Sequence, residues 1–310
     1  MKPAGTIDAL MTPGLHQVDV VRVGPDAGDR GRDIAAVEEP LEIRLGGTPF
    51  VVIMRTPGAD RDLVAGFLLS EQIVRTSADI ASMRYCVEPG LGTRDSGLGD
   101  QGSGTGDSGS GTRSEGSEID VSNVINVWLT GEAADRAARQ LAERRHAVVN
   151  SSCGVCGRRS IDDLMTGLAP IDSALSVSRT IIAALPERLR AVQQVFDATG
   201  GLHAAGLFDR HGRLEEVAED VGRHNAVDKV LGASLLRGRL PLDDRILFVS
   251  GRTSFEIVQK AVVARVPIVA SVSAPSSLAI DLAQEARLTL LGFVRGASFN
   301  IYAGEQRVVL

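Results

Sequence analysis

Apolar and polar residues alternate over residues 41–56, LEIRLGGTPFVVIMRT, in the pattern of an antiparallel hairpin with one buried face. Apolar residues at helical spacing follow within 57–74, where Asp60 is placed to cap the helix. Residues 123–130 then predict a further strand, and residues 131–145 predict an Ala-rich amphipathic helix. Together these segments predict a small α+β unit in the first half of the chain.

Beyond residue 160 the pattern changes to short strands that alternate with helices. The strands are apolar throughout rather than at every second position, which is typical of a sheet covered on both faces. We therefore expect an α/β second half with a largely parallel sheet. The predicted strands are 204–209, 245–250, 267–272 and 288–294, the predicted helices include 186–196, 253–266 and 276–286, and 215–236 passes from strand into helix.

Residues 89–118 interrupt the first unit, and 16 of these 30 residues are Gly or Ser. Such a segment buries too little apolar surface to offset its chain entropy, which predicts a disordered insertion. The predicted organisation is a smaller N-terminal α+β domain, residues 17–150, which contains this insertion. It is followed by an α/β domain, residues 151–310.

The 310 residues, 44% of them hydrophobic, suffice for two cores of ordinary size. The formal net charge of −6 creates no global positive field that would gather nucleic acid or an anionic membrane. No apolar run approaches the roughly 18–20 residues that span a bilayer, and the first residues lack the charged start and apolar stretch of a leader. We expect a cytoplasmic protein without nucleic-acid or membrane partners. Any anionic ligand would be bound by a few positively charged or N–H groups at one site.

Three cysteines are too few for a disulfide scaffold in a chain of this size, so reactive chemistry explains them better. Cys153 and Cys156 form a Cys-x-x-Cys motif flanked by glycines, and Arg158 and Arg159 follow at once. Neighbouring guanidinium groups favour the thiolate and lower the pKa of a thiol, which supports reactivity. Cys86, at an expected strand end, is interpreted as a packing residue.

The spacing of Cys153 and Cys156 alone leaves several uses open: a shared metal, a disulfide, sulfur transfer, or two free cysteines in a loop. A structural zinc ion would need two further ligands, and a zinc deaminase would need an upstream His-x-Glu, which the sequence lacks. A thioredoxin-like centre would open a helix directly after an early strand, whereas this motif lies in mid-chain. No metal site is therefore expected.

Polar and ionisable residues are dense in two further segments, TGGLHAAGLFD at 199–209 and AEDVGRHNAVDKVLG at 218–232. Glycines at the mouth of a strand let a ligand approach the backbone, and the start of a helix presents free N–H groups. His203 and His224 are therefore candidate pocket residues. The plainer alternative is that Asp220 only caps the helix and that His224 lies on its solvated face.

Two strands run through short, hydroxyl-rich turns into helices, at 246–261 and 271–283. Helix N-termini of this kind bind anions, and turns at the ends of neighbouring parallel strands would lie side by side in the crevice where open α/β sheets bind ligands. We expect phosphate to be the ligand. The serines have a plainer alternative role, because Ser is also a common helix cap. The candidate binding residues here are Ser250, Gly251, Arg252, Thr253, Ser273 and Ser276, with Lys260 as a further pocket candidate.

Six segments, taken in order, resemble the FdhD/NarQ family, the formate dehydrogenase accessory sulfurtransferases. The resemblance runs from about Leu41 to Leu310 and is interrupted by the Gly/Ser insertion. Gln72 departs from it, since many relatives have Gly there. The motifs are SSCGVCGR at 151–158, TGGLHAAGLFD at 199–209, EDVGRHNAVDKVLG at 219–232, SGRTSFEIVQKA at 250–261, SVSAPSSLAIDLA at 271–283 and GFVRGASFNIY at 292–302.

The resemblance implies a cytidine-deaminase-like fold for the C-terminal domain, a homodimer, and binding of the molybdenum cofactor as bis-molybdopterin guanine dinucleotide, which a guanine nucleotide would mimic. It implies that Cys153 takes sulfur from a cysteine desulfurase as a persulfide and that Cys156 assists or resolves it. The sulfur would pass to molybdenum before the cofactor enters formate dehydrogenase. The family's cofactor-contacting stretch matches Phe293, Val294, Arg295, Gly296, Ala297 and Ser298.

We therefore predict a sulfurtransferase that binds an anionic, guanine-containing pterin cofactor. One alternative is a non-catalytic cofactor chaperone, which would use the same pocket but need no reactive thiol. The other is a dithiol oxidoreductase, which would form a reversible Cys153–Cys156 disulfide.

Overall fold

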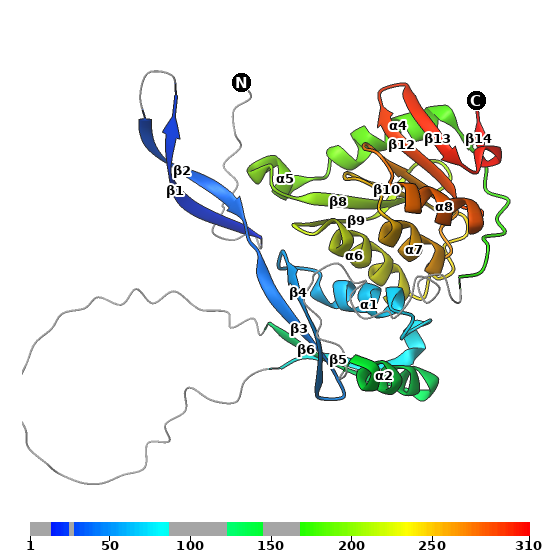
Figure 1. Cartoon of the computed structure of the whole chain (residues 1–310). Helices are drawn as coiled ribbons and strands as arrows, with labels where there is room; N and C mark the ends of the chain where they lie inside the picture. Colours follow the sequence, from blue (N-terminus) through cyan, green and yellow to red (C-terminus); the bar gives the residue numbers. More distant parts are fainter. Residues whose placement is uncertain (1–13, 25–27, 87–122, 145–167) are drawn as a thin grey trace, which may run out of the picture.

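The computed structural model describes residues 14–24, 28–86, 123–144 and 168–310. The predicted insertion at 89–118 and the Cys-x-x-Cys motif lie outside these residues. Three parts follow one another along the described chain: a projecting hairpin, a small four-stranded sheet, and a six-stranded sheet with helices on both faces (Figure 1). No helix in these ranges is both long and apolar enough to cross a membrane.

The hairpin predicted at 41–56 is confirmed as β3 (Glu39–Leu45) and β4 (Thr48–Arg55). Gly46 and Gly47 join them with positive φ angles of 56° and 86°, as a tight hairpin turn requires. The next predicted strand is β6 (Val124–Leu129), which pairs in parallel with β3 and antiparallel with β5 (Ile80–Tyr85). The short η1 (Ser77–Asp79) leads into β5, and the predicted helix α2 (Gly131–Arg144) follows β6.

Helix α1 (Asp60–Ser70) occupies the predicted segment but begins differently. Its N-cap is Ala59, in the left-handed conformation with φ 52°, so the prediction that Asp60 caps this helix is wrong. The Asp60 carboxylate pairs instead with the guanidinium of Arg55 (Oδ2–Nη2 3.0 Å), and both side chains are buried. Just beyond the helix, Gln72 has φ 58°, a conformation that glycine adopts more readily than glutamine.

The six-stranded sheet has the order β13-β12-β11-β10-β8-β9. Only β10–β11 and β11–β12 pair in parallel, so the prediction of a largely parallel sheet is wrong. The reason is that β8 and β9 form a hairpin, as do β12 and β13, and short connections join antiparallel strands. The strands are β8 (His203–Phe208), β9 (Leu214–Asp220), β10 (Ile246–Val249), β11 (Ile268–Ser271), β12 (Thr289–Arg295) and β13 (Ser298–Ala303).

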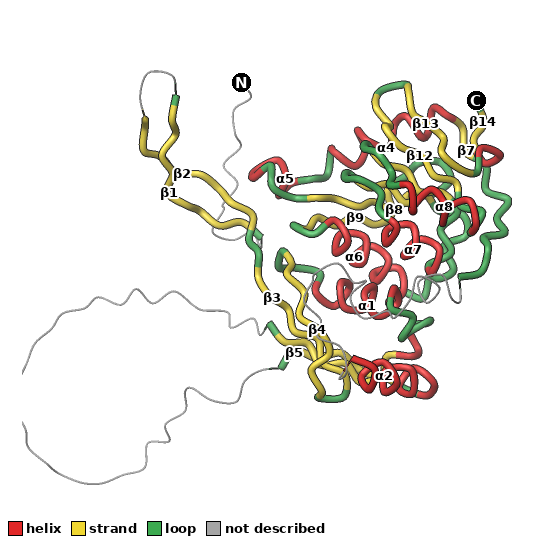
Figure 2. The backbone as a smooth tube through the Cα atoms, viewed as in Figure 1, coloured by secondary structure: helices red, strands yellow, loops and turns green. Residues whose placement is uncertain are grey.

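Helices cover both faces of this sheet (Figure 2). Residues of β10 alternate between two apolar clusters: Leu247 and Val249 pack with α6, α7 and α8, whereas Ile246 and Phe248 pack with α4. This alternation explains why the strand is apolar at every position. The helices are α4 (Arg179–Arg190), α6 (Arg223–Leu236), α7 (Phe255–Val263) and α8 (Ser277–Glu285).

The single helix predicted at 186–196 is in fact two, α4 and the short α5 (Gln194–Thr199). Helix α4 begins seven residues before the predicted start, so that Pro186 lies inside it. Near the chain end, η2 (Glu305–Arg307) leads into β14 (Val308–Val309), which pairs in parallel with β7 (Val177–Ser178) just before α4.

One apolar cluster joins the two halves of the chain, from β3 and α1 through α6, α7 and α8. Helix α1 meets α6 at Gly66 and Gly232. A Cβ added at either glycine would lie 1.9 Å from a carbonyl oxygen of the other helix. The two backbones are therefore in direct contact. The domain division at residue 150 stays a prediction, as does the cytidine-deaminase-like fold, but the described halves share a core.

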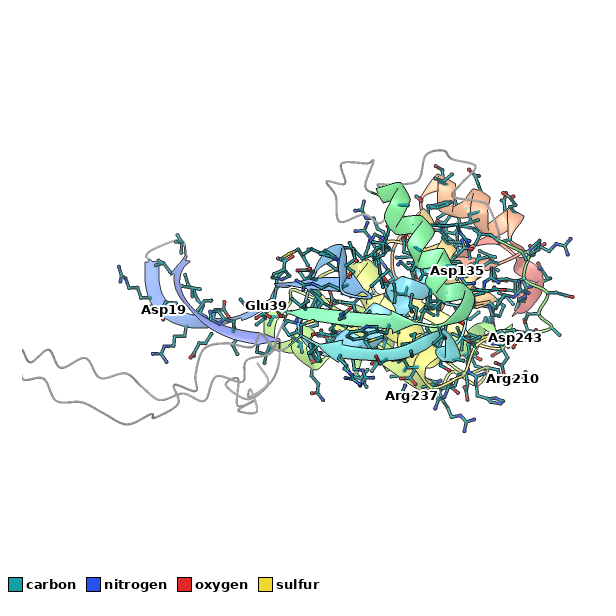
Figure 3. All side chains as sticks on the ribbon, turned by 90° about the horizontal axis from the view of Figure 1, so that it is seen from below. Asp19, Glu39, Asp135, Arg210, Arg237 and Asp243 are labelled. Carbon is teal, nitrogen blue, oxygen red and sulfur yellow. The ribbon has the colours of Figure 1, made fainter. Side chains whose placement is uncertain are left out.

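The sequence pattern predicts no strand before residue 41, yet β1 (Leu15–Val23) and β2 (Gly28–Ala36) pair there as an antiparallel hairpin. Figure 3 shows Asp19 of this hairpin at one end of the molecule, with Arg210 and Asp243 at the other. Most side chains of the hairpin are exposed on both faces. Its apolar residues, such as Val18 and Val20, are at most partly buried, and β2 has few apolar residues, so the hairpin carries only a weak strand pattern.

Candidate functional site

The two hydroxyl-rich turns lie side by side, as predicted from their positions after neighbouring strands. The turn after β10 and the turn after β11 are joined by backbone hydrogen bonds: Thr253 N–H donates to the Ala274 carbonyl (3.2 Å), and Ser276 N–H donates to the Thr253 carbonyl (3.0 Å). Ser276 also caps α8, since its Oγ accepts from Ala279 N–H (3.3 Å). The carboxyl ends of β10 and β11 thus form one continuous edge with two helix N-termini.

The β12–β13 hairpin, which contains the predicted cofactor-binding residues 293–298, joins this edge. Phe293 N–H donates to the Ser273 carbonyl (3.1 Å), and Arg295 Nε donates to the Val272 carbonyl (3.3 Å). Phe293 has φ 54° and an exposed ring, over which the Arg295 guanidinium lies 5.9 Å from the centroid. The Val294 side chain is different, because it is buried against α4 and can offer a ligand only its backbone. Exposed Gly296, Ala297 and Ser298 close the hairpin.

His203 and Ser250 meet at the start of β8. Ser250 exchanges two hydrogen bonds with Ala204: its N–H donates to the Ala204 carbonyl (2.9 Å), and its Oγ accepts from the Ala204 N–H (2.8 Å). A Cβ on Gly251 would lie 3.2 Å from His203 Nδ1, so glycine lets the imidazole sit against the turn. Burial lowers the pKa of His203 below its usual 6.5, and the nearby Arg223 and His224 lower it further. This imidazole is therefore neutral at neutral pH.

His224 lies in the first turn of α6 and faces α7. Its Nε2 is 2.8 Å from Glu256 Oε2 and 3.0 Å from Ser254 Oγ, and its side chain is 20% exposed. The alternative that His224 lies on a solvated face is therefore wrong. Asp220 does not cap α6 either: Gly222 occupies that position, and no side chain caps the helix.

Several residues of the polar segment 218–232 hold the scaffold instead of facing a ligand. Buried Asp220 pairs with buried Lys229 (2.7 Å), whose Nζ also donates to the Thr56 carbonyl (2.9 Å) and so ties the end of β4 to α6. Glu219 accepts from two backbone N–H groups at the start of α5 (2.8 and 3.0 Å). Lys260 pairs with Asp228 at 2.7 Å inside the helix layer, which argues against a pocket role.

Five buried side-chain atoms have no hydrogen-bond partner in the described chain. Three of them lie near this edge, Arg223 Nε, Thr253 Oγ1 and Glu256 Oε1, and the other two belong to the buried pair of Arg55 and Asp60. Buried polar atoms are nearly always hydrogen-bonded in folded proteins. Three buried polar atoms that lack a partner, at the starts of two neighbouring helices, are therefore unusual. The polar segment 218–232 included Arg223, but the sequence pattern did not single out Glu256, and it could not show that these atoms lack partners, because that depends on how α6 and α7 pack.

A cavity of about 980 Å³ opens between α4, α5 and the ends of β8, β10 and β11. Of the predicted binding residues, only His203 and Ser250 line it, while the turns at 251–253 and 273–276 and the hairpin at 293–298 lie outside its lining. Gly200 and Gly201, the glycines predicted at the mouth of a strand, also line it, but sequence reasoning missed the wall that α4 and α5 supply. Polar or aromatic members of that wall are Glu187, Arg190, Gln193, Phe196 and Asp197.

The predicted nucleophiles, Cys153 and Cys156, lie outside the described residues, and their placement stays a prediction. Cys86 is a half-buried free thiol at the end of β5, where its N–H donates to the Val124 carbonyl (2.8 Å). Among the residues that the structure describes, no group of three or more His, Cys, Asp or Glu side chains is arranged to hold a metal ion.

Comparison with known proteins gives consistent matches over nearly the whole chain. The model of the FdhD/NarQ family matches residues 36–309. Curated relatives called sulfur carrier protein FdhD include those of Streptomyces avermitilis, 44% identical over 294 residues (94% of both chains), and Nocardia farcinica, 45% identical over 291 residues (93% of both chains).

A solved structure supports the fold independently of the sequence. The crystal structure of a candidate formate dehydrogenase accessory protein from Desulfotalea psychrophila matches with a TM-score of 0.69, at 22% identity, over 96% of this chain and 100% of that chain. Because the family model spans 36–309 and the curated relatives match at well above 30% identity, the chain belongs to the FdhD/NarQ family.

Proposed function

We propose that this protein is a cytoplasmic sulfur carrier, active as a homodimer. It would take sulfur from a cysteine desulfurase as a persulfide on Cys153 and transfer it to bis-molybdopterin guanine dinucleotide before that substrate is inserted into formate dehydrogenase. The curated relatives are named sulfur carrier proteins, which supports the carrier role. The observation that carries the proposal is the edge of two joined turns at the N-termini of α7 and α8, where Thr253 Oγ1 has no partner among the described residues, beside a large cavity.

The residues at the strand ends suit a diphosphate-containing substrate. Thr253 Oγ1 is a hydroxyl without a partner among the described residues, at the entrance of α7. Arg252 and Arg295 are exposed on adjacent turns, where their guanidinium groups would bind phosphate oxygens in pairs of hydrogen bonds. Helix N-termini add backbone N–H donors and a favourable dipole. Two arginines, a free hydroxyl and two helix starts therefore make a fitting place for pyrophosphate.

The sulfur step needs only thiolate chemistry. The Cys153 thiolate would attack the terminal sulfur of the donor's cysteine persulfide, forming a new S–S bond while the donor's S–S bond breaks and its cysteine leaves as a thiolate. Release of the sulfur from the Cys153 persulfide as hydrosulfide needs a nucleophile that supplies an electron pair. Attack of the Cys156 thiolate on the Cys153 sulfur would release hydrosulfide and leave a Cys153–Cys156 disulfide, which a cellular dithiol would then reduce.

Replacement of Cys153 by alanine tests the proposal in cells that lack the native protein and carry formate dehydrogenase. We expect Cys153→Ala to abolish formate dehydrogenase activation while binding of guanosine diphosphate by the purified protein stays unchanged. Cys86→Ala is the matched control and should activate normally. Activation that survives Cys153→Ala would overturn the transfer chemistry and favour a non-catalytic chaperone.

A further inference from the structure

The β1–β2 hairpin projects from the rest of the molecule (Figure 1). Its two strands of nine residues pair only with each other among the described residues, so each of them is an edge strand. An isolated two-stranded hairpin is at best marginally stable in water, and three or more strands are needed for independent stability. A further strand along one edge would therefore stabilise this hairpin.

The base of the hairpin is fixed to the body of the protein. Val37 N–H donates to the Gly14 carbonyl (2.9 Å) and closes the ribbon at this end. Strand β2 contacts α5, and just beyond α5 a Cβ added to Gly201 would lie 3.7 Å from the Ala36 Cβ. Residues of α5 also line the cavity. The hairpin therefore leaves the body in a set direction, next to the cavity wall.

The two edges of the hairpin differ in charge. The projecting part of β2 reads DRGRD at 29–33, and charged residues of this kind are typical of edge strands that must not pair with another chain. Over residues 18–23, β1 has only Asp19 and Arg22 as charged residues, and the other four are valines. Val21 and Val23 are 60% and 84% exposed. Because β-branched residues favour strands, β1 is the edge suited to pairing.

A second copy of the chain fits the β1 edge better than the β2 edge. Two antiparallel strands related by a two-fold axis place one residue opposite its own copy, and the residues on either side pair reciprocally. In β2, every such centre from 29 to 33 places Asp opposite Asp or Arg opposite Arg, and like charges directly opposite destabilise a strand pair. A centre at Val20 in β1 opposes no like charges.

Strand length also selects Val20 as the centre. The pairs then run from residue 17 opposite 23 across to 23 opposite 17, which uses the projecting length of β1. A centre at Val18 would carry Val23 of each copy past Leu15 of the other, where β1 meets the body. A centre at Val21 would leave 15–18 unpaired. The pairs around the Val20 centre are Val20 with Val20, Asp19 with Val21, and Val18 with Arg22.

We propose that β1 is a dimerisation edge: two copies of this chain pair antiparallel through β1 about Val20 and form a four-stranded sheet in the order β2-β1-β1-β2. The choice of a second copy as the partner rests on the homodimer of the proposed function, whereas the edge and the register rest on charge and strand length. Because the base of each hairpin contacts α5, this sheet would hold the cavity walls of the two copies at its two ends.

Sedimentation velocity of the full chain over a dilution series measures the dissociation constant of the dimer. Val21→Asp places a new carboxylate opposite Asp19 of the other copy, twice in the symmetric interface. It should raise the dissociation constant at least about fivefold. Val52, 59% exposed on the edge strand β4, gives the matched control, and Val52→Asp should change nothing. Weakening by Val52→Asp and not by Val21→Asp would overturn the assignment.

A second substitution tests the register. Asp19→Val added to Val21→Asp restores the native composition and places the carboxylate at position 21 opposite a valine of the other copy. The carboxylate also keeps a cross-strand arginine, since position 21 lies opposite Arg30 as Asp19 lies opposite Arg32. The dissociation constant should return to within about twofold of the native value. Failure of this rescue would overturn the register centred on Val20.

A cross-link guards against a variant whose hairpin simply unfolds. In a chain that carries Cys86→Ala, Cys153→Ala and Cys156→Ala, Val20→Cys should give a disulfide-linked dimer under mild oxidation, because directly opposite Cβ atoms lie about 4.5–5.5 Å apart. Val52→Cys in the same chain should stay unlinked. Absence of the Val20→Cys cross-link would contradict the assignment.

The outcomes separate this surface from the proposed function. A native chain that sediments as a monomer would overturn the proposed homodimer and the β1 edge together. A stable native dimer that every β1 variant leaves intact would overturn the β1 edge alone. Sulfur acquisition by Cys153 is measured independently of both.

Discussion

Replacement of Gly232 by alanine would test whether α1 and α6 belong to one core. The added Cβ would lie 1.9 Å from the carbonyl oxygen of Asp62 and 2.5 Å from the amide nitrogen of Gly66. Real Cβ contacts essentially never fall below 3.0 Å, so the two helices would have to separate by about 1.1 Å at this point. Both neighbours are backbone atoms and cannot rotate away.

The cost follows from the packing that this separation disrupts. A gap of 0.5–1 Å already loses a quarter to a half of the dispersion energy between facing atoms, and overpacked cores typically lose about 1–3 kcal/mol. Alanine recovers about 1 kcal/mol through its better helix propensity. We expect the upper end of the overpacking range here, because backbone meets backbone, and hence a net loss of about 2 kcal/mol or more in the free energy of unfolding.

Urea unfolding followed by circular dichroism measures this loss. Gly238→Ala is the matched control: Gly238 follows α6 with φ 67° and has open space around its Cβ position. That variant should lose only about 1–2 kcal/mol, from the strain of a left-handed alanine. A Gly232→Ala protein as stable as the native chain would refute the direct contact of α1 with α6.

Further predictions concern the buried pair, the site histidine and the unpartnered threonine. Lys229→Met leaves the buried Asp220 carboxylate without its cation and should cost about 3–5 kcal/mol in urea unfolding; a full-stability variant would refute the pair. The lowered pKa of His203 means that the unfolded chain binds more protons as the pH falls below 6.5, so stability should decrease there. His203→Gln should flatten that decrease, and an equally steep decrease would refute the assignment. Thr253→Val should leave stability nearly unchanged but weaken guanosine diphosphate binding, whereas Thr289→Val, which loses the 2.6 Å hydrogen bond to a backbone carbonyl, should cost about 1–3 kcal/mol. Normal nucleotide binding by Thr253→Val would remove this hydroxyl from the site.

The sequence predicted the parts of the fold that local pattern determines. The alternation at 41–56 gave a hairpin, and the apolar strands such as 246–249 lie between two helix layers. The direction of β8 relative to its neighbours could not be predicted in this way, because an apolar run is the same in parallel and antiparallel pairs. The hairpin β1–β2 was not predicted for a different reason: most of its side chains are exposed, and the alternating stretch around Val18 and Val20 is short.

The residues of the candidate site likewise fall into those that local sequence pattern predicts and those that only tertiary packing brings together. The turns at 250–253 and 273–276 were predictable because strand-to-helix turns fall at one edge of such a sheet, and their backbones are joined there. The roles of Asp220 and Lys229 were not predictable, since their pairing ties α6 to the end of β4 across a long stretch of sequence. Phe196 and Gln193 escaped for the same reason, because only tertiary packing makes them a cavity wall.

The most direct measurement for the sulfur-carrier account is the intact mass of the purified protein after incubation with a cysteine desulfurase and cysteine. We expect a gain of about one sulfur atom, roughly 32 Da, that maps to Cys153, disappears in Cys153→Ala and persists in Cys86→Ala. Cys156→Ala cannot resolve the persulfide to a disulfide and should keep the added sulfur, so a Cys156→Ala chain that gains no sulfur would contradict the account.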